Sequence, residues 1–216
     1  MHDAVIFDMD GTLFDTEALF QKEWNAIAEE MGITLSDHFK YEICGTSGEA
    51  MNHVIEAHYY VDDGNEIQWE CKGRVAAALQ QEVPLKPGCR EILAYFYERG
   101  IPMAIGSSSR KELIESNLKI SGLSSYFQAI ASGDEIKHGK PAPDIFLLAA
   151  KRLGVAPKNC YVFEDSPNGI RAAYAAGMKP ILVPDLMPVT EEMKEKTLFI
   201  ADTLTEAMER LSVARP

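Results

Sequence analysis

The stretch AVIFDMDGTLFDTE, residues 4–17, changes abruptly from apolar side chains to acids. Residues 4–7 are all apolar, which predicts a short buried strand of a parallel sheet. Asp8 and Asp10 follow, and side chains two positions apart on an extended segment point to the same side. Either acid alone could belong to a turn or a helix cap, but two adjacent carboxylates repel each other unless a cation lies between them. The stretch therefore favours a functional site.

Short apolar runs alternate with helical patterns from residue 85 onward. Strands are expected in IPMAIG (101–106), QAIAS (128–132), CYVFED (160–165) and PILVP (180–184). Alternation of this kind predicts right-handed βαβ units. We therefore expect an α/β fold, a Rossmann-like parallel sheet core with helices on both faces.

Residues 16–84 interrupt this series with helical patterns alone. An apolar stripe with helical spacing precedes Gly32, a candidate C-cap, and further helices are expected over residues 49–60 and about 65–81. The members of the stripe are Phe20, Trp24, Ile27, Ala28 and Met31. The pattern predicts an all-helical cap domain, residues 16–84, inserted into a catalytic core of residues 1–15 and 85–216.

Composition excludes several classes of partner. The chain has 33 acids against 21 bases, a formal charge of −12, so nucleic acid and anionic membranes are not expected partners. No apolar run approaches a membrane span, and the chain begins on a strand without a leader pattern. A cytoplasmic protein, a monomer or weak dimer, is expected, and its four separated cysteines are expected to be reduced.

Polar side chains also follow other predicted strands. Ser107 to Ser109 end one, Glu164 and Asp165 end another, and Lys140 lies in the loop HGKPAPD. Each has a structural alternative, because serines and acids cap helices and a lone lysine is usually solvated. Ligands of open parallel sheets bind beyond the carboxyl ends of the strands, so the joint occurrence indicates one site.

Four motifs occur in a characteristic order: DMDGTLFDTE (8–17), GSSSR (106–110), GKPAPDIF (139–146) and FEDSPNGIRAAYAAGM (163–178). With them the chain resembles the haloacid dehalogenase superfamily, in the helical-cap branch that includes β-phosphoglucomutase-like phosphatases. The resemblance implies that Asp8 is the nucleophile, forming an aspartyl-phosphate, and that Asp10 is the general acid and base. It also implies that Ser107, Ser108 and Lys140 bind the phosphoryl oxygens.

The resemblance further implies Mg²⁺ as the cofactor. Its ligands would be Asp8, the main-chain carbonyl of Asp10, and Asp165, with Glu164 acting directly or through water. Mg²⁺ prefers oxygen ligands and keeps waters while binding phosphate, which suits the acidic end of the first strand.

Three functions remain open. The favoured one is a Mg²⁺-dependent phosphatase acting on a small phosphate monoester, such as a sugar phosphate or a nucleotide-like compound. The alternative is a phosphosugar mutase, whose members resemble one another in a cap histidine and a cap arginine. This chain has Phe20 and Gly48 there, and neither can bind a second phosphate. A non-catalytic metabolite- or partner-binding module is the third, and the intact motifs disfavour it.

Substrate specificity is expected to lie in the cap. Gly45 and Thr46 belong to a predicted loop that faces the core, and Lys72 is a basic residue able to reach a polar substrate, although it could equally be solvated. We expect these three residues to bind the substrate together with the phosphate-binding residues.

Overall fold

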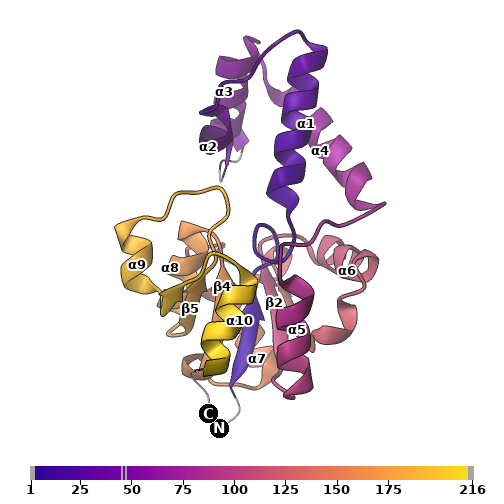
Figure 1. Ribbon diagram of the computed structural model, residues 1–216. Coiled ribbons are helices and arrows are strands. Elements are labelled where there is room, and N and C mark those ends of the chain that lie inside the picture. The colour runs from indigo at the N-terminus through magenta and orange to yellow at the C-terminus, as the bar shows by residue number, and fades with distance from the viewer. Residues whose placement is uncertain (1–2, 45, 47, 214–216) are drawn as a thin grey trace.

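The computed structural model describes residues 3–44, 46 and 48–213 and contains one parallel sheet (Figure 1). The strand order is β3-β2-β1-β4-β5-β6, and each neighbouring pair is parallel. The bounds are β1 Ala4–Phe7, β2 Met103–Ser107, β3 Ala129–Ser132, β4 Cys160–Glu164, β5 Lys179–Leu182 and β6 Phe199–Ile200. The first strand thus lies in the middle of the sheet, flanked by β2 and β4.

Helices cover both faces of this sheet. Alternate side chains of β1 point to opposite faces: Phe7 packs in the cluster that includes α5 and α10, whereas Ile6 packs in the cluster that includes α7 and α8. The predicted α/β architecture is therefore confirmed. The helix bounds are α5 Cys89–Glu98, α6 Lys111–Ile120, α7 Asp144–Leu153, α8 Pro167–Ala175, α9 Glu191–Lys196 and α10 Leu204–Val213, with 3₁₀ turns at Ser124–Tyr126, Gly133–Glu135 and Pro157–Asn159.

The segment between β1 and α5 is helical in the structure. It contains α1 Thr16–Glu30, α2 Phe39–Ile43, α3 Gly48–Tyr59 and α4 Asn65–Leu79. Helices α3 and α4 agree with the expected ranges to within two residues, and α1 begins four residues before the predicted stripe and ends one residue before its last member, Met31. Helix α2, five residues long, is not expected from the sequence. None of the helices in the described part of the chain is both long and apolar enough to cross a lipid bilayer.

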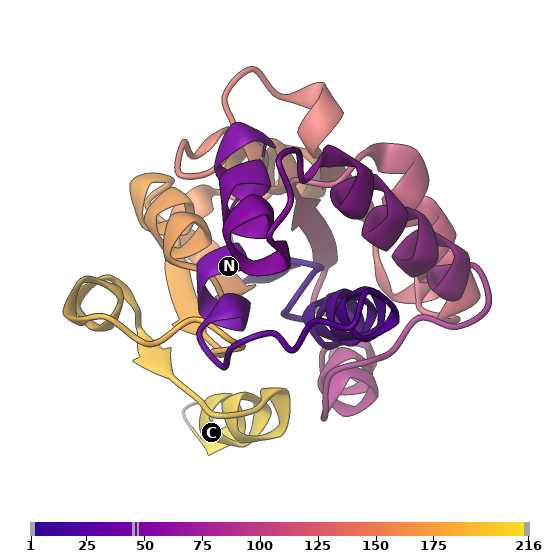
Figure 2. The same cartoon turned by 90° about the horizontal axis from the view of Figure 1, so that it is seen from above.

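These helices pack as two pairs around aromatic rings. Helix α1 packs against α4 and α2 against α3, and the pairs lie side by side above the sheet (Figures 1 and 2). The rings of Trp24, Phe39 and Tyr59 meet edge to face between the pairs. The Tyr59 hydroxyl donates to the main-chain oxygen of Trp24 at 2.6 Å, which joins α3 to α1. Met31, placed in the apolar stripe by its spacing, is 45% exposed and directly follows the last residue of α1.

The two chain crossings between these helices and the sheet run beside each other. The amide of Asp15 donates to Pro84 O at 2.9 Å, and the amide of Lys86 donates to Leu13 O at 2.9 Å. Both crossings are therefore joined by main-chain hydrogen bonds. They leave the sheet beside the carboxyl end of β1, where the acidic motif lies.

Candidate active site

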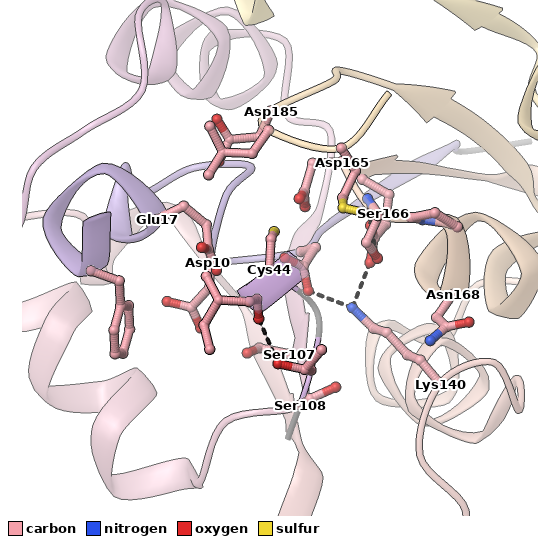
Figure 3. A pocket seen from close by; sticks show the side chains of 18 of the residues that line it. Asp10, Glu17, Cys44, Ser107, Ser108, Lys140, Asp165, Ser166, Asn168 and Asp185 are labelled. Carbon is pink, nitrogen blue, oxygen red and sulfur yellow. Dashed lines mark hydrogen bonds and ion pairs between the residues drawn. The ribbon is translucent and has the colours of Figure 1, made fainter. Parts of the chain in front are cut away.

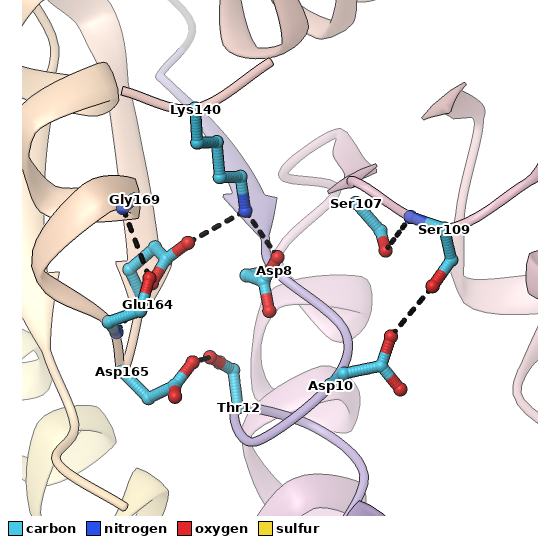
Figure 4. Close-up of polar contacts among 10 residues, drawn as sticks. Asp8, Asp10, Thr12, Ser107, Ser109, Lys140, Glu164, Asp165 and Gly169 are labelled. Carbon is cyan, nitrogen blue, oxygen red and sulfur yellow. Dashed lines mark hydrogen bonds and ion pairs between the residues drawn. The ribbon is translucent and has the colours of Figure 1, made fainter. Parts of the chain in front are cut away.

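The expected site residues line one pocket between the carboxyl edge of the sheet and the helical segment. Its volume is about 800 Å³. The core side is lined by Asp8, Asp10, Ser107, Ser108, Lys140, Glu164 and Asp165. Strands β2, β1 and β4 are neighbours in the sheet, so the side chains that follow them meet at one place (Figure 4).

Lys140 lies between two carboxylates. Its Nζ contacts Asp8 Oδ1 and donates to Glu164 Oε1 at 2.7 Å. The other oxygen of Glu164 accepts from the amide of Ser166 at 2.7 Å and from its hydroxyl at 2.9 Å. Burial alone would lower the pKa of Lys140, but the charges of Asp8 and Glu164 outweigh it and raise the pKa. Lys140 is thus held as a cation beside Asp8.

Glu164 contacts protein groups through both of its carboxylate oxygens. Its side chain is 1% exposed, and it lies against helix α8 at Gly169, where an added Cβ would come within 1.6 Å of Glu164 Oε1. A glycine is required there by this close approach. The direct role observed for Glu164 is to hold Lys140, and its expected contact with a metal stays a prediction.

Asp165 lies on the side of Asp8 that is away from Lys140 (Figure 4). Thr12 Oγ1 donates to Asp165 Oδ1 at 3.0 Å (Figure 4). Gly11, with φ of +84°, passes so close that a Cβ would lie 2.6 Å from Asp165 Oδ2. Burial, followed by the charges of Glu164 and Asp8, raises the pKa of Asp165. The motif Asp-Gly-Thr therefore shapes the turn that receives Asp165.

Asp10 is oriented by two hydroxyl groups. Thr16 Oγ1 donates to Asp10 Oδ1 at 3.1 Å, and Ser109 Oγ donates to Asp10 Oδ2 at 2.9 Å. Burial raises the pKa of Asp10 and these two hydrogen bonds oppose the shift. Thr16 begins α1 and Ser109 follows β2, so the carboxylate is fixed from both sides of the pocket. Thr16 is a site residue that the sequence analysis did not select, and Ser109 was included there only within the run of three serines, without a role of its own.

Ser107, the last residue of β2, and Ser108, which follows it, differ in their exposure. Ser107 is 2% exposed, and its Oγ accepts from the amide of Ser109 at 3.1 Å. Ser108 lines the pocket and is exposed. Ser107 and Ser108 line the same pocket as Asp8, and Figure 3 shows the two serines next to each other.

The helical segment supplies the other wall. Thr46 and Lys72 line it, as expected, whereas Gly45 lies outside the described residues. Lys72 donates to Gln68 Oε1 at 2.7 Å. The sequence analysis missed the remaining members of this wall, most of which are apolar: Glu17, Phe20, Trp24, Ile43, Cys44 and Met51. Helical periodicity marked Phe20 and Trp24 as core residues, and they line the pocket because α1 stands over the sheet edge.

The core side of the pocket has an excess of negative charge. Five carboxylates line it, together with Lys140 and with Arg171, which is paired with Glu192. The carboxylates are Asp8, Asp10, Glu164, Asp165 and Asp185. Burial raises the pKa of Asp8 to about 7 despite the opposing charge of Lys140. Carboxylates whose charge is disfavoured in this way are suited to a hard cation.

The donor set fits an ion that keeps several waters. Among the described residues, no three His, Cys, Asp or Glu side chains form a group able to hold a metal by themselves. Two carboxylates, Asp8 and Asp165, and main-chain oxygen remain as donors. Mg²⁺ is commonly bound through one or two carboxylates plus substrate phosphate and water, so the residues present fit it.

Buried acids and a lysine at the carboxyl edge of a parallel α/β sheet suit phosphoryl transfer, which depends on positioning and charge. The family model of haloacid dehalogenase-like hydrolases matches residues 2–177. The chain belongs to the haloacid dehalogenase-like hydrolases.

Individual relatives cover nearly the whole chain. A probable pseudouridine-5′-phosphatase of Drosophila melanogaster is 34% identical over 206 residues, covering 91% of this chain and 87% of the relative. Hexitol phosphatase B of Escherichia coli K12 is 30% identical over 214 residues, covering 97% and 94%. The crystal structure of a putative β-phosphoglucomutase from Thermotoga maritima superimposes with a TM-score of 0.82 at 29% identity, covering 98% of this chain and 99% of that chain.

These findings confirm the predicted family and the predicted enzyme class. Curated relatives are named as phosphatases, so the chain is assigned to the phosphatases of this family. One structural neighbour, in contrast, is named as a putative β-phosphoglucomutase.

Proposed function

We propose that the chain is a Mg²⁺-dependent phosphomonoesterase that works through an aspartyl-phosphate on Asp8. The contact of the Lys140 ammonium with Asp8 is the observation that carries this proposal. A cation held there stabilises the negative charge that the transferring phosphoryl oxygens spread in the transition state. Ser107 and Ser108 line the same space and would donate to those oxygens.

Asp8 and Asp10 have different roles in the proposed reaction. Asp8 attacks phosphorus in line and forms the acyl phosphate while the ester bond to the leaving oxygen breaks. Asp10, held by Thr16 and Ser109, gives that oxygen a proton and later removes one from the water that hydrolyses the intermediate. The raised pKa of Asp10 favours the protonated form that the first step requires.

Asp8, Asp165 and the main-chain carbonyl of Asp10 would hold Mg²⁺. When bound, the ion would offset the charge of the carboxylates and of the phosphate that approaches them. Glu164 keeps Lys140 in place through its 2.7 Å hydrogen bond.

Removal of the metal is expected to abolish phosphate release. Asp8, Asp165 and an incoming phosphate would otherwise bring several negative charges together at short range. Phosphate release from p-nitrophenyl phosphate should stop in excess EDTA and return when Mg²⁺ is added beyond the chelator. Full activity in EDTA would contradict the metal assignment.

The substrates proposed are small sugar phosphates or nucleotide-like phosphates. The relatives named as hexitol and pseudouridine-5′ phosphatases support this class. Residues 16–84 are proposed to act as a cap that closes over the pocket, with the joined crossings as hinges. We further propose a cytoplasmic monomer or weak dimer that binds neither nucleic acid nor membranes, in keeping with its formal charge of −12.

The phosphosugar mutase is the second candidate, because a structural neighbour bears that name. The resemblance places Phe20 and Gly48 at the positions where members with mutase activity carry histidine and arginine. Phe20 lines the pocket, and Gly48 is not among the residues that line it. Water should therefore capture the aspartyl-phosphate.

Product analysis tests this choice. With β-glucose 1-phosphate and a trace of the 1,6-bisphosphate, we expect inorganic phosphate to appear in step with substrate loss. Glucose 6-phosphate that forms faster than inorganic phosphate would replace the phosphatase proposal by the mutase.

A further inference from the structure

Lys86 is a buried cation that the proposed reaction does not use. It lies on the second crossing, which leads from α4 back to the sheet, and its side chain is 16% exposed. Its Nζ donates to Asp185 Oδ1 at 2.7 Å and lies 3.4 Å from Asp15 Oδ1. Lys86 is not among the described residues that line the pocket, so any part it has in the reaction is exerted through other residues.

The two acids that meet Lys86 belong to different parts of the fold. Asp15 lies on the first crossing, directly before α1, and Asp185 lies in the loop after β5, with its side chain 10% exposed. Carboxylates brought together in this way repel each other unless a cation lies between them. Burial alone would lower the pKa of Lys86, but Asp185 and Asp15 outweigh it and raise the pKa. Lys86 is therefore held as the cation that joins the first crossing to the core.

Main-chain hydrogen bonds tie Lys86 to the same crossing. The amide of Lys86 donates to Leu13 O at 2.9 Å. The turn that ends there is closed by bonds of its own, because the amides of Leu13 and Phe14 both donate to Met9 O at 3.0 Å. A displacement of the crossing would therefore be transmitted to the turn that carries Asp10.

Thr16 connects the crossing to the carboxylate of Asp10. It directly follows Asp15 in the chain, and adjacent Cα atoms are fixed about 3.8 Å apart across a trans peptide. Its Oγ1 donates to Asp10 Oδ1 at 3.1 Å, which is one of the two hydroxyl contacts that orient this carboxylate. The side chain and the main chain of Lys86 thus act on one place, the segment from which Asp10 is oriented.

We propose that Lys86 is a positioning residue for Asp10. By holding Asp15 against the core, Lys86 keeps Thr16 at the distance from which it directs the Asp10 carboxylate toward the leaving oxygen and the hydrolytic water. This inference rests on the proposed phosphatase function and on the role of Asp10 as its acid and base. Loss of Lys86 should then lower turnover only through Asp10.

The variant Lys86→Met tests this role, because it removes the charge and keeps a long unbranched side chain. The measurement is phosphate release from the best substrate in a panel of sugar monophosphates. We expect kcat to fall about 10- to 100-fold, since a misplacement of about 1 Å can cost as much as about 10²-fold. KM should stay within about threefold, because Lys86 lies outside the pocket and would not contact the substrate.

A double-mutant cycle separates positioning from a structural role. In the Asp10→Asn background, Lys86→Met should lower kcat by less than about threefold, because the group that Lys86 positions is already absent and residues that act through one another have non-additive effects. A structural role would give the same loss with and without Asp10. Lys158→Met changes an exposed lysine of the core; it is the matched control and should leave kcat unchanged in both backgrounds.

A further variant guards against unfolding. Lys86→Met leaves Asp185 as a buried acid without its cation, and an uncompensated buried charge is strongly destabilising. The double variant Lys86→Met/Asp185→Asn removes that charge as well. It should melt close to the wild-type temperature and still show the loss in kcat, because Asp15 remains unheld.

Each other outcome decides against the inference. A kcat within about threefold of wild type in either Lys86 variant would mean that Asp10 is oriented without Lys86. Equal losses in the presence and absence of Asp10 would give Lys86 a purely structural role while the proposed phosphatase stands. Full turnover in Asp10→Asn itself, or a wild-type chain that releases phosphate from none of these compounds in Mg²⁺, would overturn the proposed function and the inference together.

Discussion

Replacement of Asp8 by Asn is expected to lower phosphate release by about 10⁴-fold or more, the scale of loss seen when a nucleophile is removed. An amide oxygen is a far weaker nucleophile than a carboxylate, so no acyl phosphate can form on residue 8. Asn keeps the shape of Asp and an oxygen that can accept from Lys140. The loss should therefore appear in turnover and not in folding.

The intermediate itself can be followed in the same experiment. Acid-quenched wild-type chain incubated with substrate should carry one phosphoryl group on the peptide that contains Asp8, and the Asp8→Asn peptide should carry none. Asp8→Ala serves as a second variant that cannot revert by deamidation. Asp202→Asn, a change at an exposed acid, is the matched control and should retain full turnover. Turnover close to wild type in Asp8→Asn would mean that the nucleophile lies elsewhere.

The fold was predictable where side-chain patterns are strong. The four apolar residues of β1 are buried, as a central parallel strand requires, and the stripe containing Trp24 and Ile27 faces the aromatic core. Short elements escaped prediction. Strand β6 has two residues and α2 has five, too few for a period to show, and both depend on packing against distant parts of the chain.

The site was predictable where reactive polar residues stand at the carboxyl ends of predicted strands or in a loop beside them. Asp8, Asp165 and Lys140 are unusual residues at carboxyl ends or in a loop beside them, and the structure brings them into one pocket. The role of Ser109 was not predictable in the same way. It depends on one atomic contact, the hydrogen bond to Asp10, and such contacts are fixed by tertiary packing that leaves no periodic signal.

The variant Asp10→Asn should separate the two steps of the reaction. General acid and base assistance is typically worth about 10²–10⁴-fold. A sugar leaving group needs a proton from Asp10, so both the formation and the hydrolysis of the aspartyl-phosphate should slow. p-Nitrophenolate leaves without a proton, so only hydrolysis, where Asp10 would remove a proton from water, should slow with this substrate.

Rapid mixing of Asp10→Asn with p-nitrophenyl phosphate should therefore give a burst of about one nitrophenolate per active site, followed by a rate roughly 10²–10⁴-fold below wild type. The amide oxygen that this variant keeps at position 10 can still accept from Thr16 or Ser109, so the side chain should keep its orientation. Ser109→Ala, which removes one of the two hydroxyl donors to Asp10, should cost much less, within about tenfold, and give no burst. A full-rate steady state in Asp10→Asn would exclude Asp10 as the base. If the burst and the steady-state turnover were both lost, formation of the aspartyl-phosphate would itself depend on Asp10. Nitrophenolate needs no proton in that step, so Asp10 would then assist the attack of Asp8.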